Sequence, residues 1–204
     1  MRNMFIFKKR ILESESGLFY LDKEGMLTDF KPSETNPIIK EKIEEPFAYN
    51  GYITKESISH LIIPKGVRGF ADDFFRGITV TCRFELPEGF LFIGNSFHDN
   101  SSHGCVFSHC TLPDVRLPDS LKELGLFAFG CSVINYLQIP STICSPYGRQ
   151  FKDSHIKTLC LPKRWRDNFY LDDHSLIKKS LSDGWQKFWG YLVFDAEIDH
   201  LVFE

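Results

Sequence analysis

Residues 95–110 bring together the side chains of this chain that are best suited to bind a metal ion. The segment holds three of the seven histidines and two of the six cysteines, and imidazole and thiolate are common ligands of tetrahedral zinc. The spacing is unlike a zinc motif, because no Cys-x2-Cys or His-x3-His pair occurs and the last histidine and cysteine are adjacent. We therefore expect a polar surface loop whose cysteines turn inward, with no bound metal or other cofactor. The weak metal candidates are His98, His103, Cys105, His109 and Cys110.

Nucleophilic catalysis has little support in the sequence. Serine, histidine and aspartate are neighbours at Ser154-His155 and at Asp172-Asp173-His174, but a catalytic triad is assembled in space by groups with defined roles. The chain contains no Gly-x-Ser-x-Gly elbow, no Walker loop and no Gly-x-Gly-x-x-Gly fingerprint. We expect no enzymatic activity and assign no catalytic residue.

A short phrase of an apolar, a usually polar and an apolar residue followed by proline recurs along the chain. Its prolines stand at positions 64, 87, 118, 140 and 162, at intervals of 23, 31, 22 and 22 residues. The alternation predicts a half-buried strand, which proline ends because it cannot donate to a ladder. A period near 22 is typical of leucine-rich repeats, and the long interval predicts an insertion of roughly 8 residues. The copies are Leu61-Ile62-Ile63-Pro64, Phe84-Glu85-Leu86-Pro87, Val115-Arg116-Leu117-Pro118, Leu137-Gln138-Ile139-Pro140 and Leu159-Cys160-Leu161-Pro162.

Each phrase is followed by a similar turn. Small residues such as Ala71, Gly94 and Gly125 recur after it and permit a tight turn. A phenylalanine then returns the chain to the core. One unit cannot bury its own apolar face, so the units must stack and share a core. The predicted core phenylalanines are Phe74, Phe97, Phe129 and Phe151.

The unit from Leu117 to Cys131 resembles the leucine-rich repeats of the BspA-like family, which read roughly Leu-x-Ile-Pro-x-Ser-Val-x-x-Ile-Gly-x-x-Ala-Phe-x-x-Cys. Five concordant units extend the resemblance over about residues 57–165. The resemblance implies an α/β fold, a leucine-rich-repeat solenoid with one strand and a short helical or irregular turn in each unit. The family has no shared catalytic residues, so none is assigned by resemblance.

Residues 1–56 are expected to form an N-terminal cap, because the first unit of a solenoid would otherwise expose its apolar side. Strand-like segments around 18–27 flank a glycine-bearing loop and predict a hairpin. Asn36 before Pro37 suits the start of a helix, which predicts a short helix over 38–44.

Residues 166–204 are expected to form a C-terminal cap after the repeats of residues 57–165. An aspartate at 172 or 173 predicts a short helix over 174–181. Alternating segments at 191–194 and 200–203 predict last strands that close the open sheet edge. The repeats and the two caps together predict one continuous structural domain.

Period two along each strand places the middle residue of the phrase on the outward face of the sheet. Neighbouring units then set Glu85 beside Arg116 and Arg83 beside Asp114, as opposite charges that stabilise a ladder. The face is either a self-satisfied solvated surface or a binding surface anchored by Tyr136 and Arg116, residue types that are enriched in hot spots. The outward rows are Ile62, Glu85, Arg116, Gln138, Cys160 and His60, Arg83, Asp114, Tyr136, Thr158; the predicted partner-binding residues are Arg83, Glu85, Asp114, Arg116, Tyr136 and Gln138.

Composition restricts the remaining possibilities. A chain with 43% hydrophobic residues and 20 phenylalanines is globular, and a net charge of −3 gives no electrostatic footprint for nucleic acid. The apolar run near the N-terminus is too short for a secretory signal, and none approaches the roughly 20 residues of a membrane span. We expect a cytoplasmic protein without membrane insertion, although members of the resembled family are often found at the cell surface. Its six cysteines are expected to be reduced and mostly buried.

The sequence favours a non-enzymatic module that binds a protein partner through the sheet face or the 95–110 insertion. The reason is that solenoids present extended surfaces suited to binding, whereas fold alone does not determine function. Two alternatives stay open. One is a metal-binding or thiol-dependent activity in the 95–110 loop, and the other is a purely structural repeat module.

Overall fold

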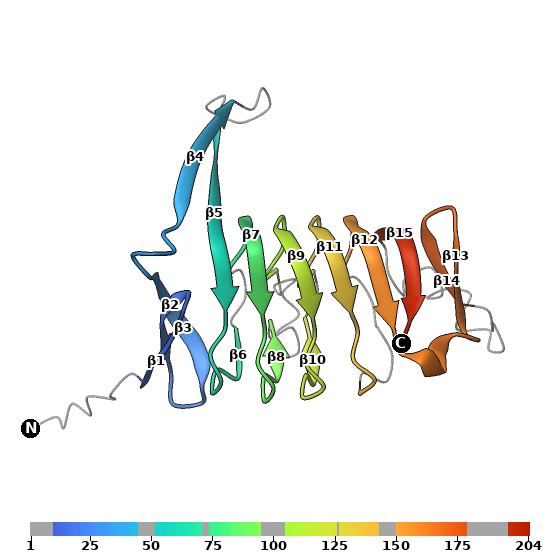
Figure 1. The fold of residues 1–204 in the computed structure, drawn as a ribbon, viewed down its shortest axis with the longest axis horizontal. Coiled ribbons are helices and arrows are strands. Elements are labelled where there is room, and N and C mark those ends of the chain that lie inside the picture. Colours follow the sequence, from blue (N-terminus) through green and yellow to red (C-terminus); the bar gives the residue numbers. More distant parts are fainter. Residues whose placement is uncertain are drawn as a thin grey trace, which may run out of the picture.

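The computed structural model in Figure 1 describes residues 10–44, 52–70, 74–94, 105–125, 127–142, 150–178 and 196–204 of the 204-residue chain. Its larger sheet has seven strands in the order β15-β12-β11-β9-β7-β5-β4. The strands from β5 to β15 run parallel, and β4 pairs antiparallel with β5. They are β4 (Ile39–Glu44), β5 (Tyr52–Ile62), β7 (Ile78–Glu85), β9 (Thr111–Arg116), β11 (Val133–Gln138), β12 (Ser154–Leu161) and β15 (Ala196–Phe203).

A second sheet of six strands, in the order β1-β2-β3-β6-β8-β10, lies beside the larger sheet and forms another side of the repeat structure. Its first three strands are an antiparallel meander, which includes the hairpin expected around residues 18–27, and the last three are two-residue strands that add in parallel. Each turn of the chain thus supplies one long and, in most units, one short strand. The members are β1 (Arg10–Ser14), β2 (Gly17–Leu21), β3 (Met26–Pro32), β6 (Gly69–Phe70), β8 (Phe92–Ile93) and β10 (Glu123–Leu124).

The strand-rich architecture agrees with the expected repeat fold, whereas the α/β class is not confirmed. The described residues contain no α-helix, and the single 3-10 helix η1 covers Lys163–Trp165. The helix expected over 38–44 is strand β4, because β5 offers it a free edge and the two pair from Ile39 to Glu44. The helix expected over 174–181 is contradicted as far as residue 178, where β13 (Phe169–Asp172) and β14 (Ser175–Lys178) form a hairpin.

The first and third residues of each phrase point into the core, as the alternation predicts. Leu61, Val115, Leu137 and Leu159 are 0% exposed. The third residues are also buried, except Leu86, which is partly covered. The strand after residue 195 repeats this pattern without its proline: Leu201 of β15 pairs in register with Leu159 of β12. The sheet therefore contains one repeat strand beyond the five phrases.

A ladder of stacked phenylalanines fills the core behind the strands. The rings of Phe75, Phe107, Phe129 and Phe151 lie 5.6, 5.3 and 5.3 Å apart between successive centroids, with interplanar angles of 2°, 16° and 7°. Two of the four expected members are therefore correct. Phe75, and not the partly buried Phe74, belongs to the ladder. Phe107 holds the place expected for Phe97, which lies outside the described residues.

Two residues after each ladder phenylalanine, the backbone turns through a left-handed conformation. The positive φ values are 79° at Gly77, 57° at His109, 55° at Cys131 and 56° at Asp153. Non-glycine residues seldom adopt this region, and Asn, Asp and His are among those that tolerate it best. The chain thus turns at a fixed place before each strand. Cys131 is exposed at this turn, although the cysteines were expected to be mostly buried.

The residue after this turn is buried, and at two positions, Cys110 and Ser132, its side chain bonds the preceding unit. The Sγ atom of Cys110 donates to the Phe75 carbonyl at 3.1 Å, and Oγ of Ser132 donates to the Phe107 carbonyl at 2.6 Å. Cys110 therefore occupies a serine position of the repeat. The insertion was predicted to span residues 95–110, and this range is too long. Residues 105–110 belong to the regular unit, so the extra residues come before residue 105 in the sequence.

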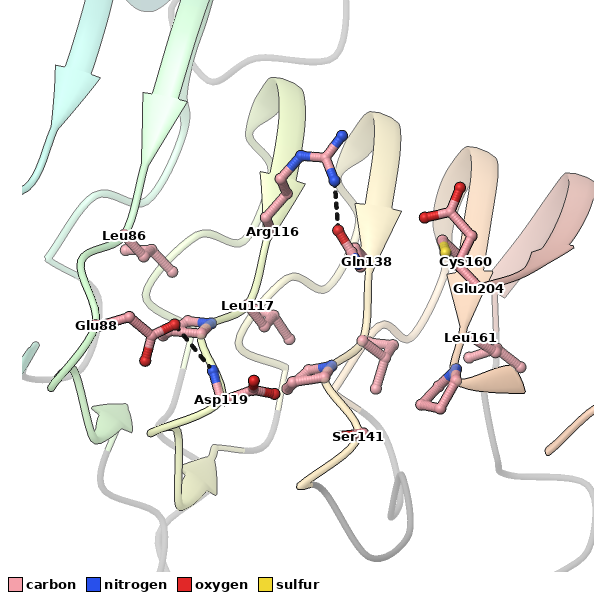
Figure 2. A pocket seen from close by; sticks show the side chains of 14 residues that line it. Leu86, Glu88, Arg116, Leu117, Asp119, Gln138, Ser141, Cys160, Leu161 and Glu204 are labelled. Atoms are coloured by element: carbon pink, nitrogen blue, oxygen red, sulfur yellow. Dashed lines mark hydrogen bonds between the residues drawn. The ribbon is translucent and has the colours of Figure 1, made fainter. Parts of the chain in front are cut away.

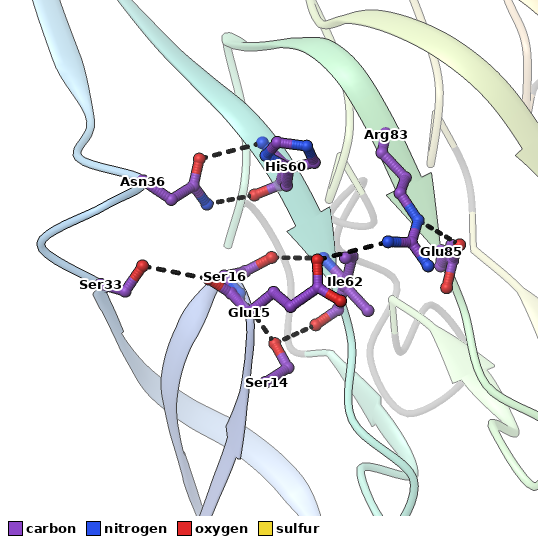
Figure 3. Close-up of polar contacts among 9 residues, drawn as sticks. All are labelled: Ser14, Glu15, Ser16, Ser33, Asn36, His60, Ile62, Arg83 and Glu85. Carbon is purple, nitrogen blue, oxygen red and sulfur yellow. Dashed lines mark hydrogen bonds and ion pairs between the residues drawn. The ribbon is translucent and has the colours of Figure 1, made fainter.

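Side chains from the N-terminal segment pair with the free edge of β5 (Figure 3). Buried Asn36 donates from Nδ2 to the His60 carbonyl at 2.7 Å and accepts from the His60 N–H at 3.0 Å. Further along, Ser16 Oγ accepts from the Ile62 N–H at 2.7 Å and Ser14 Oγ donates to the Ile62 carbonyl at 2.6 Å. These bonds satisfy backbone groups that would otherwise lack a neighbouring strand.

Candidate protein-binding surface

The outward rows expected from the sequence are present as neighbours in the sheet. His60 is in register with Arg83, and Tyr136 is in register with both Asp114 and Thr158. In the other row, Gln138 lies between Arg116 and Cys160, and Ile62 is in register with Glu85. Both rows continue onto β15 through His200 and Val202. The register is continuous from β5 to β7 and from β9 to β15, and these parallel strands carry the side chains on one face.

The charged pairs on this face differ from those expected. Arg83 contacts Glu85 of its own strand, with 2.6 Å between Nε and Oε1, and reaches Glu15 at 3.3 Å. Asp114 accepts a hydrogen bond from Asn135 at 3.1 Å. Within the described chain, neither the Glu85–Arg116 nor the Arg83–Asp114 ion pair forms. The reason is that β7 and β9 pair only at Thr79 with Thr111, so their far ends are not held in ladder register.

Arg116 makes two contacts that orient its side chain. Its Nη1 atom donates to Oε1 of Gln138 on the next strand, and its Cζ atom lies 4.8 Å from the centroid of the Tyr136 ring. Neither partner carries a negative charge, and among the described residues Arg116 has no carboxylate partner. The guanidinium is exposed, and a cation over an aromatic face is attracted by the ring. Arg116 thus presents, in a fixed place, a guanidinium whose direct contacts are to neutral groups.

Tyr136 is half-buried between Arg116 and Cys160. Burial and a hydrogen bond with Cys160 raise the pKa of the Tyr136 hydroxyl to about 12. Burial also raises the pKa of the Cys160 thiol. Cys160 belongs to the predicted outward row but is 0% exposed. The prediction that its side chain is accessible on this face was therefore wrong.

The outward face is hollowed between β7 and β9 into a depression of about 480 Å³, which we term the sheet groove. β7 carries one residue more than its neighbour, because Ile58 pairs with Val80 but His60 pairs with Arg83. Such a bulge bends the strand and disrupts the local ladder, which leaves room beside β9. The sheet groove is lined by Cys82, Arg83, Phe84, Glu85, Leu86, Pro113, Asp114 and Arg116.

A second depression of about 400 Å³, the end groove, follows the carboxyl ends of β7, β9, β11 and β12 (Figure 2). Arg116 and Leu86 line both grooves, so the two meet at Arg116. The prolines at 118, 140 and 162 form part of its wall. Its rim carries acidic side chains at Glu88, Asp119 and Glu204 and polar ones at Gln138 and Ser141.

All six predicted partner-binding residues lie at or beside these grooves. Arg83, Glu85 and Asp114 line the sheet groove, Gln138 lines the end groove, and Arg116 lines both. Tyr136 lines neither but lies beneath the guanidinium of Arg116. The grooves themselves, and the contributions of Leu86 and Pro113, were not foreseen. The signal that could have found them is a difference in spacing, since the buried Val80 and Phe84 of β7 are four residues apart, whereas the buried pair Leu112 and Val115 of β9 is three apart.

The expected metal candidates do not come together in the described chain. His98 and His103 lie outside the described residues. Cys105 is half-buried, His109 is exposed at the corner, and Cys110 is buried with its thiol donating to a backbone carbonyl. Burial raises the pKa of the Cys110 thiol to about 12. A thiol so placed is a poor nucleophile and a poor metal ligand at neutral pH.

The adjacent serine and histidine residues noted in the sequence do not form a catalytic pair. Ser154 is buried and donates to the Phe151 carbonyl, whereas His155 faces outward to Asp199. Neighbouring strand residues point to opposite faces, which separates the two. Asp173 and His174 form the turn of the β13–β14 hairpin with φ values of 43° and 60°.

No helix in the described parts of the chain has the length and apolar character needed to cross a membrane.

Comparison with known families identifies the repeat. Neither the curated proteins nor the solved structures searched contain a significant match. The profile of the BspA type leucine-rich repeat region matches residues 47–168, more than half of the chain, in six copies. The matched region contains the strands β5, β7, β9, β11 and β12, the phenylalanine ladder and both rows of outward side chains. The chain belongs to the BspA-type leucine-rich repeat family.

Proposed function

We propose that this protein is a non-enzymatic module that binds a protein partner through the outward sheet face around Arg116 and Tyr136. Leucine-rich repeats commonly mediate protein interactions. The observation that carries the proposal is Arg116 itself, which lies where the two grooves meet and, among the described residues, has no carboxylate partner.

The chemistry of this place favours a partner that presents a carboxylate. A planar guanidinium binds carboxylates with two parallel hydrogen bonds. The Tyr136 ring beneath Arg116 and the bond to Gln138 hold the guanidinium in place, so little side-chain entropy is lost on binding. The adjoining grooves of about 480 and 400 Å³ can receive the neighbouring side chains of an extended segment. An acidic residue of the partner is therefore expected at Arg116.

The sheet face is favoured over the 95–110 insertion as the binding surface. Residues 105–110 are built into the repeat through Phe107 and Cys110. A thiol-dependent activity in this segment is disfavoured by the burial of Cys110 and the raised pKa of its thiol. The purely structural alternative differs from our proposal in one respect, since it requires no partner at the sheet face.

The test begins with immobilised wild-type protein, which should retain a partner from a lysate of the source cells. The partner is then purified and its affinity measured by calorimetry for wild type and for the double variant Arg116→Glu/Tyr136→Ala. Loss of two hot-spot residues should weaken binding by about 100-fold or more. Circular dichroism must show that the variant keeps the wild-type fold.

A matched control is Lys122→Glu/Tyr170→Ala. It makes the same charge reversal and tyrosine truncation at two exposed positions that line neither groove, and it should bind like wild type. Equal affinity of the first double variant and wild type would remove the sheet face from consideration. Retention of no protein by wild type would favour the structural alternative.

A further inference from the structure

We propose that His155, Glu197 and Asp199 form a binding site for a divalent first-row transition ion, with Zn²⁺ as the probe. The site lies on the outward face of β12 and β15, away from both grooves. It is the only group of three potential His, Cys, Asp or Glu ligands that the described residues bring within 4.8 Å of one another. It is independent of the function proposed above.

The backbone register places these side chains together. His155 on β12 is in register with Glu197 on β15, and Ile156 is in register with Ile198. Ile156 and Ile198 are both 0% exposed, so they anchor the two strands in the core. The ligand candidates on either side of Ile198 therefore stand on rigid elements and not on a loop, which favours precise positioning.

The distances suit a metal centre. The Nε2 atom of His155 lies 3.1 Å from Oδ2 of Asp199. Two ligands of a tetrahedral zinc ion with bonds of about 2.0–2.1 Å are separated by about 3.3 Å, so only a small adjustment admits an ion between them. Glu197 is exposed, and its flexible side chain can close the remaining distance. Three protein ligands leave one position for water.

The ligand set selects the class of ion. One imidazole with two carboxylates suits zinc and its neighbours better than calcium or magnesium, which prefer all-oxygen sites. His174, on the β13–β14 turn, contacts β15 next to the proposed site. Its backbone carbonyl accepts the Ile198 N–H at 2.8 Å, and its Nδ1 atom lies 3.2 Å from the Ile198 carbonyl and 3.7 Å from Oδ1 of Asp199. These contacts hold the β13–β14 turn against β15 beside the site.

The test is a calorimetric titration of the tag-free, chelator-treated full chain with ZnCl₂ at neutral pH. Wild type should bind one ion at this site, and His155→Ala or Asp199→Asn should each weaken that binding at least about tenfold. Asp199→Asn keeps the shape of the side chain and removes its charge, so it tests coordination without a change in volume. A nitrogen-15 NMR spectrum of the histidines should show the His155 ring shifting on addition of zinc.

Two control variants separate this site from other ligands. His109→Asn removes an exposed imidazole at a corner whose φ of 57° asparagine tolerates, and it should bind zinc like wild type. Cys82→Ser/Cys131→Ser removes the two thiols that are exposed among the cysteines the structure describes, and this variant should also retain the site. The proposal is overturned if wild type binds no stoichiometric zinc, if both ligand variants bind as tightly as wild type, or if loss of the thiols abolishes the binding. His155 and Asp199 would then form a hydrogen bond and nothing more.

Discussion

The guanidinium of Arg116 on β9 lies over the ring of Tyr136 on β11, with Cζ 4.8 Å from the ring centroid. The two residues come from different outward rows of neighbouring strands, since Tyr136 is in register with Asp114 and Arg116 is in register with Gln138. The Arg116 side chain therefore leans across the face toward Tyr136. This contact joins the rows into one surface.

Replacement of Tyr136 by phenylalanine should change how stability depends on alkaline pH. Burial, first of all, raises the pKa of Tyr136 from 10.0 to about 12. The unfolded state therefore loses this proton at a lower pH than the folded state, so the contribution of Tyr136 is complete below pH 10 and is lost as the pH rises toward 12. Urea unfolding between these pH values should show a shallower decline for Tyr136→Phe than for wild type.

A second substitution, Tyr170→Phe, controls for the loss of a hydroxyl elsewhere. Tyr170 is 41% exposed, and its variant should follow the wild-type pH profile. Parallel profiles for wild type and Tyr136→Phe would mean that Tyr136 ionises in the folded protein as readily as in the unfolded one.

Truncation of Phe129 to alanine should be among the most destabilising single changes. The ring is 0% exposed and stacks on both sides, against Phe107 and Phe151. Its loss removes buried apolar surface and leaves a cavity, which costs about 3–5 kcal/mol. Urea denaturation measures the free energy of unfolding. Tyr170→Ala, at an exposed site, should stay within about 0.5 kcal/mol of wild type, and a comparable loss in both variants would contradict the ladder's role.

Replacement of Asn36 by alanine tests whether the N-terminal segment caps the array. The change leaves the N–H and the carbonyl of His60 without their side-chain partners, and an unsatisfied buried polar group costs about 1–3 kcal/mol. Stability should fall by that amount, and hydrogen exchange at the His60 amide should accelerate. The neighbouring variant Thr35→Ala, whose side chain is exposed, should alter neither. Unchanged exchange at His60 in Asn36→Ala would show that water replaces the amide without cost.

The cysteines should differ sharply in reactivity. Cys82 is exposed, and hydrogen bonds from Ser59 and Thr81 lower the pKa of its thiol, whereas burial raises that of Cys110 to about 12. Since the thiolate is the reactive form, iodoacetamide should label Cys82 in the native protein and reach Cys110 only after unfolding. Peptide mass spectrometry follows both sites in one sample. In urea the two should label alike, and native labelling of Cys110 at the rate of Cys82 would contradict its burial.

The strands of the repeat were predictable because one physical constraint acts on each of them. Leu137 and Ile139 must face a shared core, so alternation alone fixes which of their neighbours, such as Gln138, point outward. The outward rows follow from the same alternation. The separation of β7 and β9 was missed because it depends on a single extra residue: Val80 and Phe84 are four residues apart, whereas Leu112 and Val115 are three apart.

The helix prediction at 38–44 failed because a local signal was overruled by a distant partner. Asn36 and Pro37 suit a helix start, but the Asn36 side chain bonds the His60 backbone instead of capping a helix. The residues that follow pair with β5, where Lys40 also meets Glu56 at 2.5 Å. The edge of β5 lies later in the chain, so the sequence around residues 38–44 does not indicate that this pairing partner is available.

The ladder position in the long unit was misassigned for a related reason. The sequence offers Phe97 and Phe107, and spacing from the preceding proline favoured the first. In the structure, the ladder position is fixed relative to the strand that follows it. Phe107, His109 and Cys110 therefore occupy the places that Phe129, Cys131 and Ser132 hold in the next unit. The small hydrogen-bonding residue three positions after the phenylalanine was the signal that could have found it.

The equal separations of the last three rings of the ladder have a consequence for the number of repeats that such a protein can hold. Phe107, Phe129 and Phe151 are 22 residues apart and meet at the same centroid distance of 5.3 Å. Excision of residues 111–132 would join Cys110 to Val133 and bring Phe107 onto Phe151, in a ring contact like the present one between Phe129 and Phe151. The two ends of the array would keep their own neighbours. Such a chain can gain or lose whole units during evolution. The area of its outward sheet face then changes while the packing between units stays the same.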